Sequence, residues 1–167
     1  MKNKNGYFRL TIILIGTIIL TIITCNLYRN YDGNKANISY ISKYVTNIQY
    51  KELSNAITEL NSNSFIYLTY IGNKNIYESE RKIRKVLKKY DLEDNFIYVD
   101  CTNDIDDNNH VSSLKNIFTV GKREIKLPAI IYFKDNNPVD YIDSTEGLID
   151  GTRFTQLLDE YEIESIK

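Results

Sequence analysis

Only a few side chains in this sequence have the chemistry of a nucleophile or a redox group. The sequence contains two cysteines, Cys25 and Cys101, and a single histidine, His110. Cys25 lies at the edge of a long apolar stretch and Cys101 lies far along the chain, so we expect no disulfide between them. Ser79 falls near the start of a predicted helix. Because the sequence places no histidine or lysine to take its proton, we interpret it as an ordinary helix serine.

Cys101 is the one thiol at a position where α/β proteins place chemistry. It follows a predicted buried strand, and sites in such folds gather at the carboxyl ends of the strands. A single thiol there could form a mixed disulfide or a sulfenic acid. The alternative, which we favour, is a half-buried structural cysteine.

An acidic run follows Cys101 and offers oxygen ligands. Its members are Asp104, Asp106, Asp107, Asn108 and Asn109. The run lacks the glycine and the distal glutamate of a calcium-binding loop, so we interpret it as a solvated turn and expect no metal. We also expect no cofactor. The formal net charge of −1 gives no reason to expect a nucleic acid as a partner.

The chain begins with a predicted membrane segment. Residues 10–28 carry no charge and are rich in isoleucine and leucine, and as a helix they would cross the hydrocarbon core of a bilayer. Basic residues in 1–9 precede this segment, which predicts a cytoplasmic N-terminus and a domain outside the cytoplasm. We favour an uncleaved, single-pass signal anchor in the cell membrane. The alternatives are a lipoprotein signal ending at Cys25 and a cleaved secretory signal.

The remaining sequence divides into a polar linker, 29–43, a domain, 44–163, and a short tail, 164–167. The domain is organised around a nearly continuous apolar and aromatic run, 65–71, which predicts a strand buried on both faces. A helix with one apolar face is predicted to follow, from Ile76 to Tyr90.

Charge placement suits this helix. Glu78 and Glu80 are expected in its first turn and lysines in its last, where each sign complements the helix dipole. Further strands are predicted at 44–48, 96–99, 127–133 and 138–142, and further helices at 51–60, 110–118 and 150–161. The strand at 96–99 has predicted helices on both sides in the sequence, which predicts that it pairs in parallel through a right-handed crossover, whereas the last two strands form a hairpin. The sequence therefore predicts an α/β fold with a central mixed sheet.

The order β-α-β-α-β-α-β-β-α resembles the thioredoxin fold over 44–163. The stretch LPAIIYFKDNNPVDYI, with Leu127 and Pro128 at its head, is similar to the cis-proline strand and hairpin of that superfamily. The strand, loop and helix from Phe65 to Tyr90 resemble the element that carries the redox cysteines. Within the superfamily, YIGNKNIYESERKIRKVL is similar to the bacteriocin-transport-accessory type, whose loop reads approximately Y-I-G-x-x-x-C-x-x-C.

The resemblance implies that the CxxC pair is lost, because Ile76 and Ser79 stand at the two cysteine positions. Disulfide exchange needs a thiolate and a second, resolving thiol, so the resemblance implies a protein that is not a disulfide oxidoreductase. It also implies a groove that binds a peptide or protein partner, in an accessory role in bacterial export or envelope processes. The expected groove residues are Ile76, Tyr77, Ser79, Leu127 and Pro128. The alternative is a thiol-redox protein that acts through Cys101 alone.

Overall fold

The computed structural model describes residues 4–106, 108, 110, 111, 114, 118 and 124–166. The chain divides into two compact units, 1–35 and 36–167. Most of the predicted helix at 110–118 lies outside the described residues. The bounds of the other elements differ from the predicted ones by a few residues.

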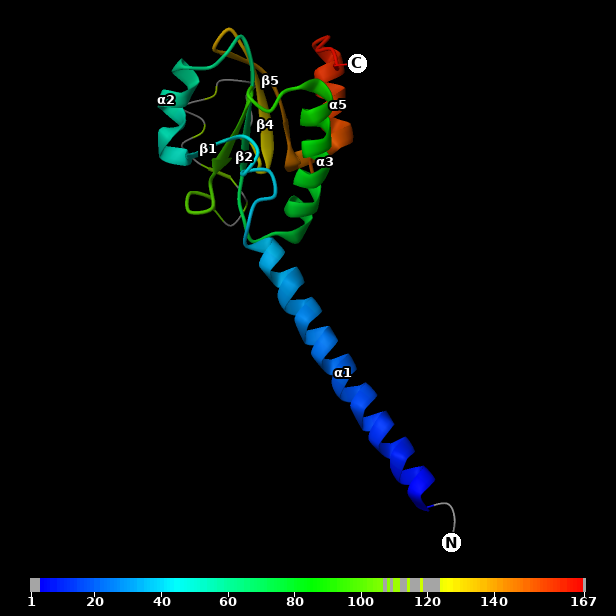
Figure 1. Ribbon diagram of the computed structural model, residues 1–167. Coiled ribbons are helices and arrows are strands. Elements are labelled where there is room, and N and C mark those ends of the chain that lie inside the picture. Colours follow the sequence, from blue (N-terminus) through cyan, green and yellow to red (C-terminus); the bar gives the residue numbers. More distant parts are fainter. Residues whose placement is uncertain are drawn as a thin grey trace. The chain divides into compact units, whose positions relative to one another are not determined.

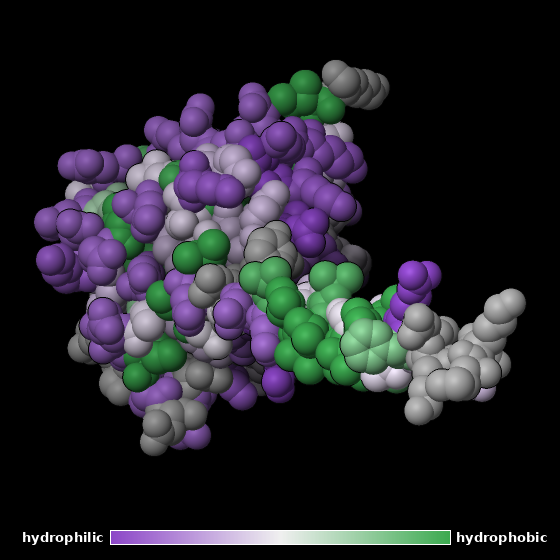
Figure 2. All heavy atoms as spheres, turned by 60° about the horizontal axis from the view of Figure 1, so that its bottom comes forward, coloured by the Kyte–Doolittle hydropathy of each residue, from purple (hydrophilic) through white to green (hydrophobic). Residues whose placement is uncertain are grey.

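The first unit is a single long helix, α1 (Lys4–Ala36). Its stretch Tyr7–Asn30 has a mean hydropathy of 2.4 and is long and apolar enough to cross a membrane, a test that a signal sequence also passes. Figure 2 shows that its side chains in view are mainly hydrophobic. The hydroxyls of Thr11, Thr21 and Thr24 each donate to the carbonyl four residues earlier. These polar groups are therefore satisfied within the helix, as a lipid environment requires. Because α1 ends at Ala36, half of the expected linker is helical.

The second unit contains a five-stranded mixed sheet in the order β1-β3-β2-β4-β5 (Figure 1). The strands are β1 (Thr46–Gln49), β2 (Asn63–Thr69), β3 (Phe96–Asp100), β4 (Ala129–Lys134) and β5 (Asn137–Asp143). β3 pairs in parallel with both β1 and β2, whereas β4 pairs antiparallel with β2 and β5. The predicted parallel pairing and terminal hairpin are confirmed.

Helices cover both faces of this sheet (Figure 1). One side carries the 3-10 turn η1 (Tyr50–Glu52) and α2 (Leu53–Thr58), and the other carries α3 (Lys74–Tyr90) and α5 (Gly151–Glu160). This strand order and layering make the domain a thioredoxin-like α/β fold, as predicted.

α3 begins earlier than predicted. Asn73 is its N-cap, and the Asn73 side chain accepts a hydrogen bond of 2.9 Å from the backbone N–H of Asn75. The first turn therefore holds no acidic residue. The prediction that Glu78 and Glu80 lie in the first turn is wrong, because the asparagine cap starts the helix before the apolar period becomes visible.

The side chains on the two faces of β2 pack into two separate apolar cores. Phe65 and Tyr67 enter the core beneath α3 and α5, and Ile66 and Leu68 enter the core beside α2. All four side chains have no exposed surface. The predicted two-sided burial of this strand is confirmed.

The packed domain starts earlier than the expected boundary at residue 44. Ile41 has no exposed surface and belongs to the core beneath α3 and α5. The backbone N–H of Tyr44 donates to the carbonyl of Ile41 at 2.9 Å, which closes a turn at this point. The second half of the expected linker is thus part of the folded domain.

Gly151, the first residue of α5, lies where α5 approaches α3 most tightly. A Cβ atom at Gly151 would stand 3.1 Å from the carbonyl oxygen of Lys82 and 3.2 Å from Cγ2 of Val86.

We therefore expect Gly151→Val to lower the free energy of unfolding by about 2 kcal/mol, because the larger side chain forces the two helices apart. Urea unfolding of a fragment spanning 36–167 measures this. Gln156→Ala, an exposed change on the same helix, is the control and should lie within about 0.5 kcal/mol of the unsubstituted fragment. Equal stabilities for Gly151→Val and the control would contradict the tight approach.

Candidate functional site

The predicted site residues gather at one end of the sheet. Ala129 of β4 pairs with Leu68 of β2, so the preceding residue, Pro128, lies next to Thr69 at the carboxyl end of β2. From there the chain passes through a short loop into α3, which begins at Lys74. The Leu127–Pro128 peptide bond is cis, as the resemblance implied. The proline loop and the start of α3 therefore share one edge of the domain.

A segment from Asp143 to Asp150 connects these two parts. On one side, the Ser144 hydroxyl donates to the carbonyl of Leu127 at 2.7 Å, and Asp143 accepts from the backbone N–H of Lys126 at 3.2 Å. On the other side, the Ser79 hydroxyl of α3 donates to the carbonyl of Ile149. We call residues 143–150 the bridging segment.

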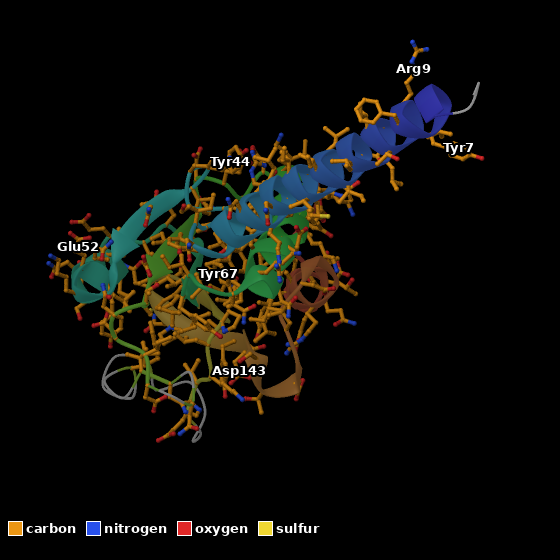
Figure 3. All side chains as sticks on the ribbon, turned by 90° about the horizontal axis from the view of Figure 1, so that it is seen from below. Tyr7, Arg9, Tyr44, Glu52, Tyr67 and Asp143 are labelled. Carbon is orange, nitrogen blue, oxygen red and sulfur yellow. The ribbon has the colours of Figure 1, made fainter. Side chains whose placement is uncertain are left out.

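Arg153 of α5 holds the bridging segment in place through hydrogen bonds to its backbone. Nη1 of Arg153 donates to the carbonyls of Asp143 at 3.0 Å and Gly147 at 2.7 Å. The buried Asp143 side chain also accepts from the backbone N–H and the hydroxyl of Thr145, both at 3.0 Å; Asp143 is labelled in Figure 3. Charge-assisted hydrogen bonds of this kind fix the shape of the segment around its one 3-10 turn, η2 (Ser144–Glu146).

The predicted groove residues lie together, but most of them are covered. Ile76, Ser79, Leu127 and Pro128 are all buried. Tyr77 is partly exposed, and its ring packs edge-on against Tyr40 with centroids 5.5 Å apart. Apart from Tyr77, the residues of the expected groove therefore support the surface from beneath and expose little of it themselves.

An open cavity of about 310 Å³ lies beside Ser79. It is lined by Asn75, Glu78, Ser79, Lys82, Leu148 and Asp150. Leu148, from the bridging segment, keeps 40% of its surface exposed. Lys82 and Asp150 form an ion pair of 3.7 Å across the α3–α5 side of the cavity. An apolar side chain flanked by charged and amide groups is suited to binding a partner.

Among the described residues, no hydrogen bond joins the Ser79 hydroxyl to a basic side chain. Its hydroxyl donates to a backbone carbonyl, which cannot accept a proton as a general base. His110 belongs to another segment, where it forms an isolated bridge with Lys126 and its ring nitrogen lies 3.9 Å from Asp106. The interpretation of Ser79 as a structural helix serine agrees with this geometry.

Cys101 lies inside the core beside α2 and has no exposed surface. Burial, with smaller effects of the Asp104 and Asp100 charges, raises the pKa of its thiol to about 12. Thiol chemistry requires the thiolate, so this environment suppresses both nucleophilic attack and oxidation. The structure gives no support to a redox role for Cys101.

The acidic run closes its own turn. Asp106 accepts from the backbone N–H groups of Asn108 at 2.9 Å and His110 at 2.8 Å, and the bond from His110 is the main reason that the pKa of Asp106 is lowered. Asp107 and Asn109 lie outside the described residues. Within the described part of the chain, no three histidine, cysteine or acidic side chains gather as a metal site would require.

Sequence reasoning missed Glu80, a buried carboxyl on the inner face of α3. Only 1% of Glu80 is exposed, and its Oε2 accepts three hydrogen bonds from the start of the domain. The donors are the hydroxyl of Ser39 at 2.9 Å and the backbone N–H groups of Tyr40 at 2.5 Å and Ile41 at 3.2 Å. Glu80 therefore attaches the chain that leaves α1 to the middle of α3.

The surroundings of Glu80 favour its neutral form. Burial raises the pKa of Glu80 to about 7, although its three hydrogen bonds act in the opposite direction. Tyr67 of β2 and Tyr98 of β3 face the same region, and burial followed by the negative charge of Glu80 raises the pKa of both phenols. The helical period could have revealed this position, because Glu80 falls in register with Ile76, Ile83 and Leu87.

No protein-family model matches the chain. No curated protein sequence matches it either. The domain is similar to solved structures of thioredoxins. Oxidised thioredoxin from Plasmodium falciparum shares 16% identity over 70% of this chain and 97% of that chain, with a TM-score of 0.48. Mitochondrial thioredoxin 3 from Saccharomyces cerevisiae shares 14% identity over 72% of this chain and 98% of that chain, with a TM-score of 0.48. Thioredoxin f2 from Chlamydomonas reinhardtii shares 7% identity over 72% of this chain and 98% of that chain, with a TM-score of 0.49. Strand order and strand direction, rather than these scores, define the fold.

Glu80 should make the stability of the domain depend on pH. Its pKa is about 7 in the folded state against an ordinary value of 4.5, so the folded state binds the proton more tightly than the unfolded state. The stability from this proton is complete below about pH 4.5 and is lost as the pH rises through about 7. We expect the difference in unfolding free energy between the unsubstituted fragment and Glu80→Gln to change by roughly 3 kcal/mol over that range.

Urea unfolding of the fragment 36–167 at a series of pH values measures this difference. Gln156→Ala, an exposed change that removes no titratable group, is the control and should leave the pH dependence unchanged. Identical pH profiles for the unsubstituted fragment and Glu80→Gln would show that Glu80 does not titrate in this way.

Cys101 should be inert in the folded domain. The fragment 36–167 contains no other cysteine, so a maleimide reagent reports on this thiol alone. Because burial and a pKa of about 12 both suppress the thiolate, we expect labelling at least about 100-fold slower than in urea-unfolded fragment. Equal rates in the two states would restore the redox hypothesis for Cys101.

Proposed function

We propose that this protein is anchored in the cell membrane by α1, with its domain outside the cytoplasm, and that the domain binds an extended peptide or protein partner without disulfide exchange. The sequence supports the absence of exchange chemistry, because its two cysteines are far apart and neither is near the start of α3. The basic residues before the apolar stretch support the orientation. The process in which such a protein takes part is an accessory step of export or envelope assembly.

The observation that supports partner binding best is the bridging segment. It ties the cis-proline loop to α3 through Ser144 and Ser79, and it presents the exposed Leu148 beside the cavity. A surface that is held in shape before binding loses little conformational entropy when a partner arrives. Leu148 keeps 40% of its surface exposed on this fixed segment and so offers apolar surface to a partner.

The chemistry of the surface indicates the kind of partner. Leu148 provides an apolar contact, and the side chains of Asn75, Glu78 and Lys82 around it provide donors, acceptors and charge. Tyr77 is the accessible member of the expected groove. The partner segment should therefore carry an apolar side chain between polar residues, with Ile76, Ser79, Leu127 and Pro128 supporting the contact surface from beneath.

We expect Leu148→Glu to weaken peptide binding at least about tenfold, because it removes an apolar contact of roughly 1.5–3 kcal/mol. A displayed library of random linear peptides, selected on the fragment 36–167, supplies the ligands, and calorimetric titration of a selected peptide measures the change. Tyr77→Ala should weaken the binding of the same peptide. Val139→Glu is the matched control, since Val139 on β5 is also 40% exposed but lies away from the cavity lining. Selection of no peptide, or loss of binding in Val139→Glu alone, would reject this site.

A further inference from the structure

Cations and tyrosines gather where the start of the domain meets the outer side of α3. We call this surface the cationic patch, and it consists of the exposed Lys43, Arg81, Lys85 and Lys88 and the buried Arg84 around Tyr40 and Tyr44. A hollow of about 150 Å³ lies within it, lined by all of these residues except Lys43. Figure 3 shows Tyr44 at the periphery of the domain, in contrast to Tyr67 in the interior.

The cations of the patch lie close to the faces of its aromatic rings. Nζ of Lys43 is 5.3 Å from the ring centroid of Tyr40 and 5.0 Å from that of Tyr44. Cζ of Arg84 is 4.3 Å from the centroid of Tyr44. The two rings are themselves 5.7 Å apart. These contacts hold positive charge and aromatic surface together in one place.

The charge of the patch is only partly neutralised within the protein. Arg81 pairs with Glu78 at 2.8 Å, and Arg84 pairs with Glu93. Among the described residues, no carboxylate lies within ion-pair distance of Lys43, Lys85 or Lys88. The whole chain carries a formal charge of −1, so this excess of positive charge is a local feature.

Chain length keeps the patch near any membrane that holds α1. The apolar stretch of α1 ends at Asn30, and the helix continues through Ala36. Six more helical residues rise about 9 Å, and the four residues on to Tyr40 extend at most about 14 Å. Tyr40 therefore lies within roughly 25 Å of the end of the apolar stretch along the chain. Such a short tether gives the patch a high effective concentration at the bilayer surface.

We propose that the cationic patch docks the domain onto anionic phospholipid headgroups of the membrane that holds α1. Lysine and arginine bind the phosphates of such a surface, and tyrosine favours the boundary between headgroups and acyl chains. Ile38, which is 57% exposed and lies just before the patch, adds an apolar group on the same approach. The inference rests on the membrane anchor of the proposed function and is independent of peptide binding.

A tryptophan at position 44 tests this docking in the full-length chain. The natural sequence contains no tryptophan, so the fluorescence of Tyr44→Trp reports on this position alone. The variant is reconstituted into nanodiscs of phosphatidylcholine, or of phosphatidylcholine with phosphatidylglycerol, each containing brominated acyl chains as a quencher. We expect strong quenching only in the discs that contain phosphatidylglycerol, and loss of this quenching in about 1 M salt, where the screening length falls to about 3 Å.

Charge reversal provides the matched comparison. Lys85→Glu with Lys88→Glu, in the Tyr44→Trp background, should lower the ratio of docked to free domain at least about tenfold, since each cation contributes roughly fivefold. Lys51→Glu with Lys134→Glu changes the net charge equally at exposed positions outside the patch and should leave quenching unchanged. Circular dichroism and thermal unfolding establish that both double variants fold.

Three results would overturn the proposal. The first is equal quenching in both lipid compositions, and the second is quenching that survives Lys85→Glu with Lys88→Glu. The third is an unquenched tryptophan in discs that have incorporated the chain, which would be expected if the cations bind an acidic protein instead. If the chain enters neither kind of disc, the membrane anchor itself is wrong. This outcome differs from a failure of docking, in which the chain enters the discs but the tryptophan is not quenched.

Discussion

The domain depends on β2, the middle strand of the sheet, which is buried on both faces. Phe65 and Tyr67 point into one core and Ile66 and Leu68 into the other, and full burial of each such side chain contributes roughly 1.5–3 kcal/mol. Phe65 also stacks on Tyr132 of β4 at 5.1 Å and meets Phe154 of α5 edge-on at 5.4 Å. Because β2 runs directly into the loop before α3, the position of this strand fixes where the helix begins and where the site can form.

The sequence predicted an element correctly wherever the spacing of its apolar residues matches the residues that the fold buries. The apolar run of β2, the one-sided period of α3 and the hairpin of β4 and β5 each carry their own pattern, so the mixed sheet could be predicted. The start of the domain carries no such pattern. Ile41 lies in a stretch of mixed apolar and polar residues, and its backbone N–H donates to Glu80, 39 residues further along the chain. The helical period marks Glu80 as an inward position, but it does not show which distant segment pairs with it.

The same limit applies to the candidate site. Sequence placed Ile76, Ser79 and Pro128 at one end of the sheet, and register and backbone agree with that placement. It did not reveal that the bridging segment joins the proline loop to Ser79 by hydrogen bonds. The segment acquires its shape from the hydrogen bonds of Asp143 and Arg153 rather than from apolar spacing. Short polar loops of this sort are specified by side-chain to backbone contacts that only the folded chain brings together.

The attachment of the chain to Glu80 has a mechanical consequence. A pull on α1 travels along the backbone and first loads the turn at Ser39–Ile41, where three donors bind one carboxylate oxygen. The tension is thus passed to the middle of α3, which is embedded in the core, before it reaches β1. As the edge strand, β1 is paired on one side only and would be the easiest element to peel from the sheet. Glu80 therefore shields this strand from a force applied along α1.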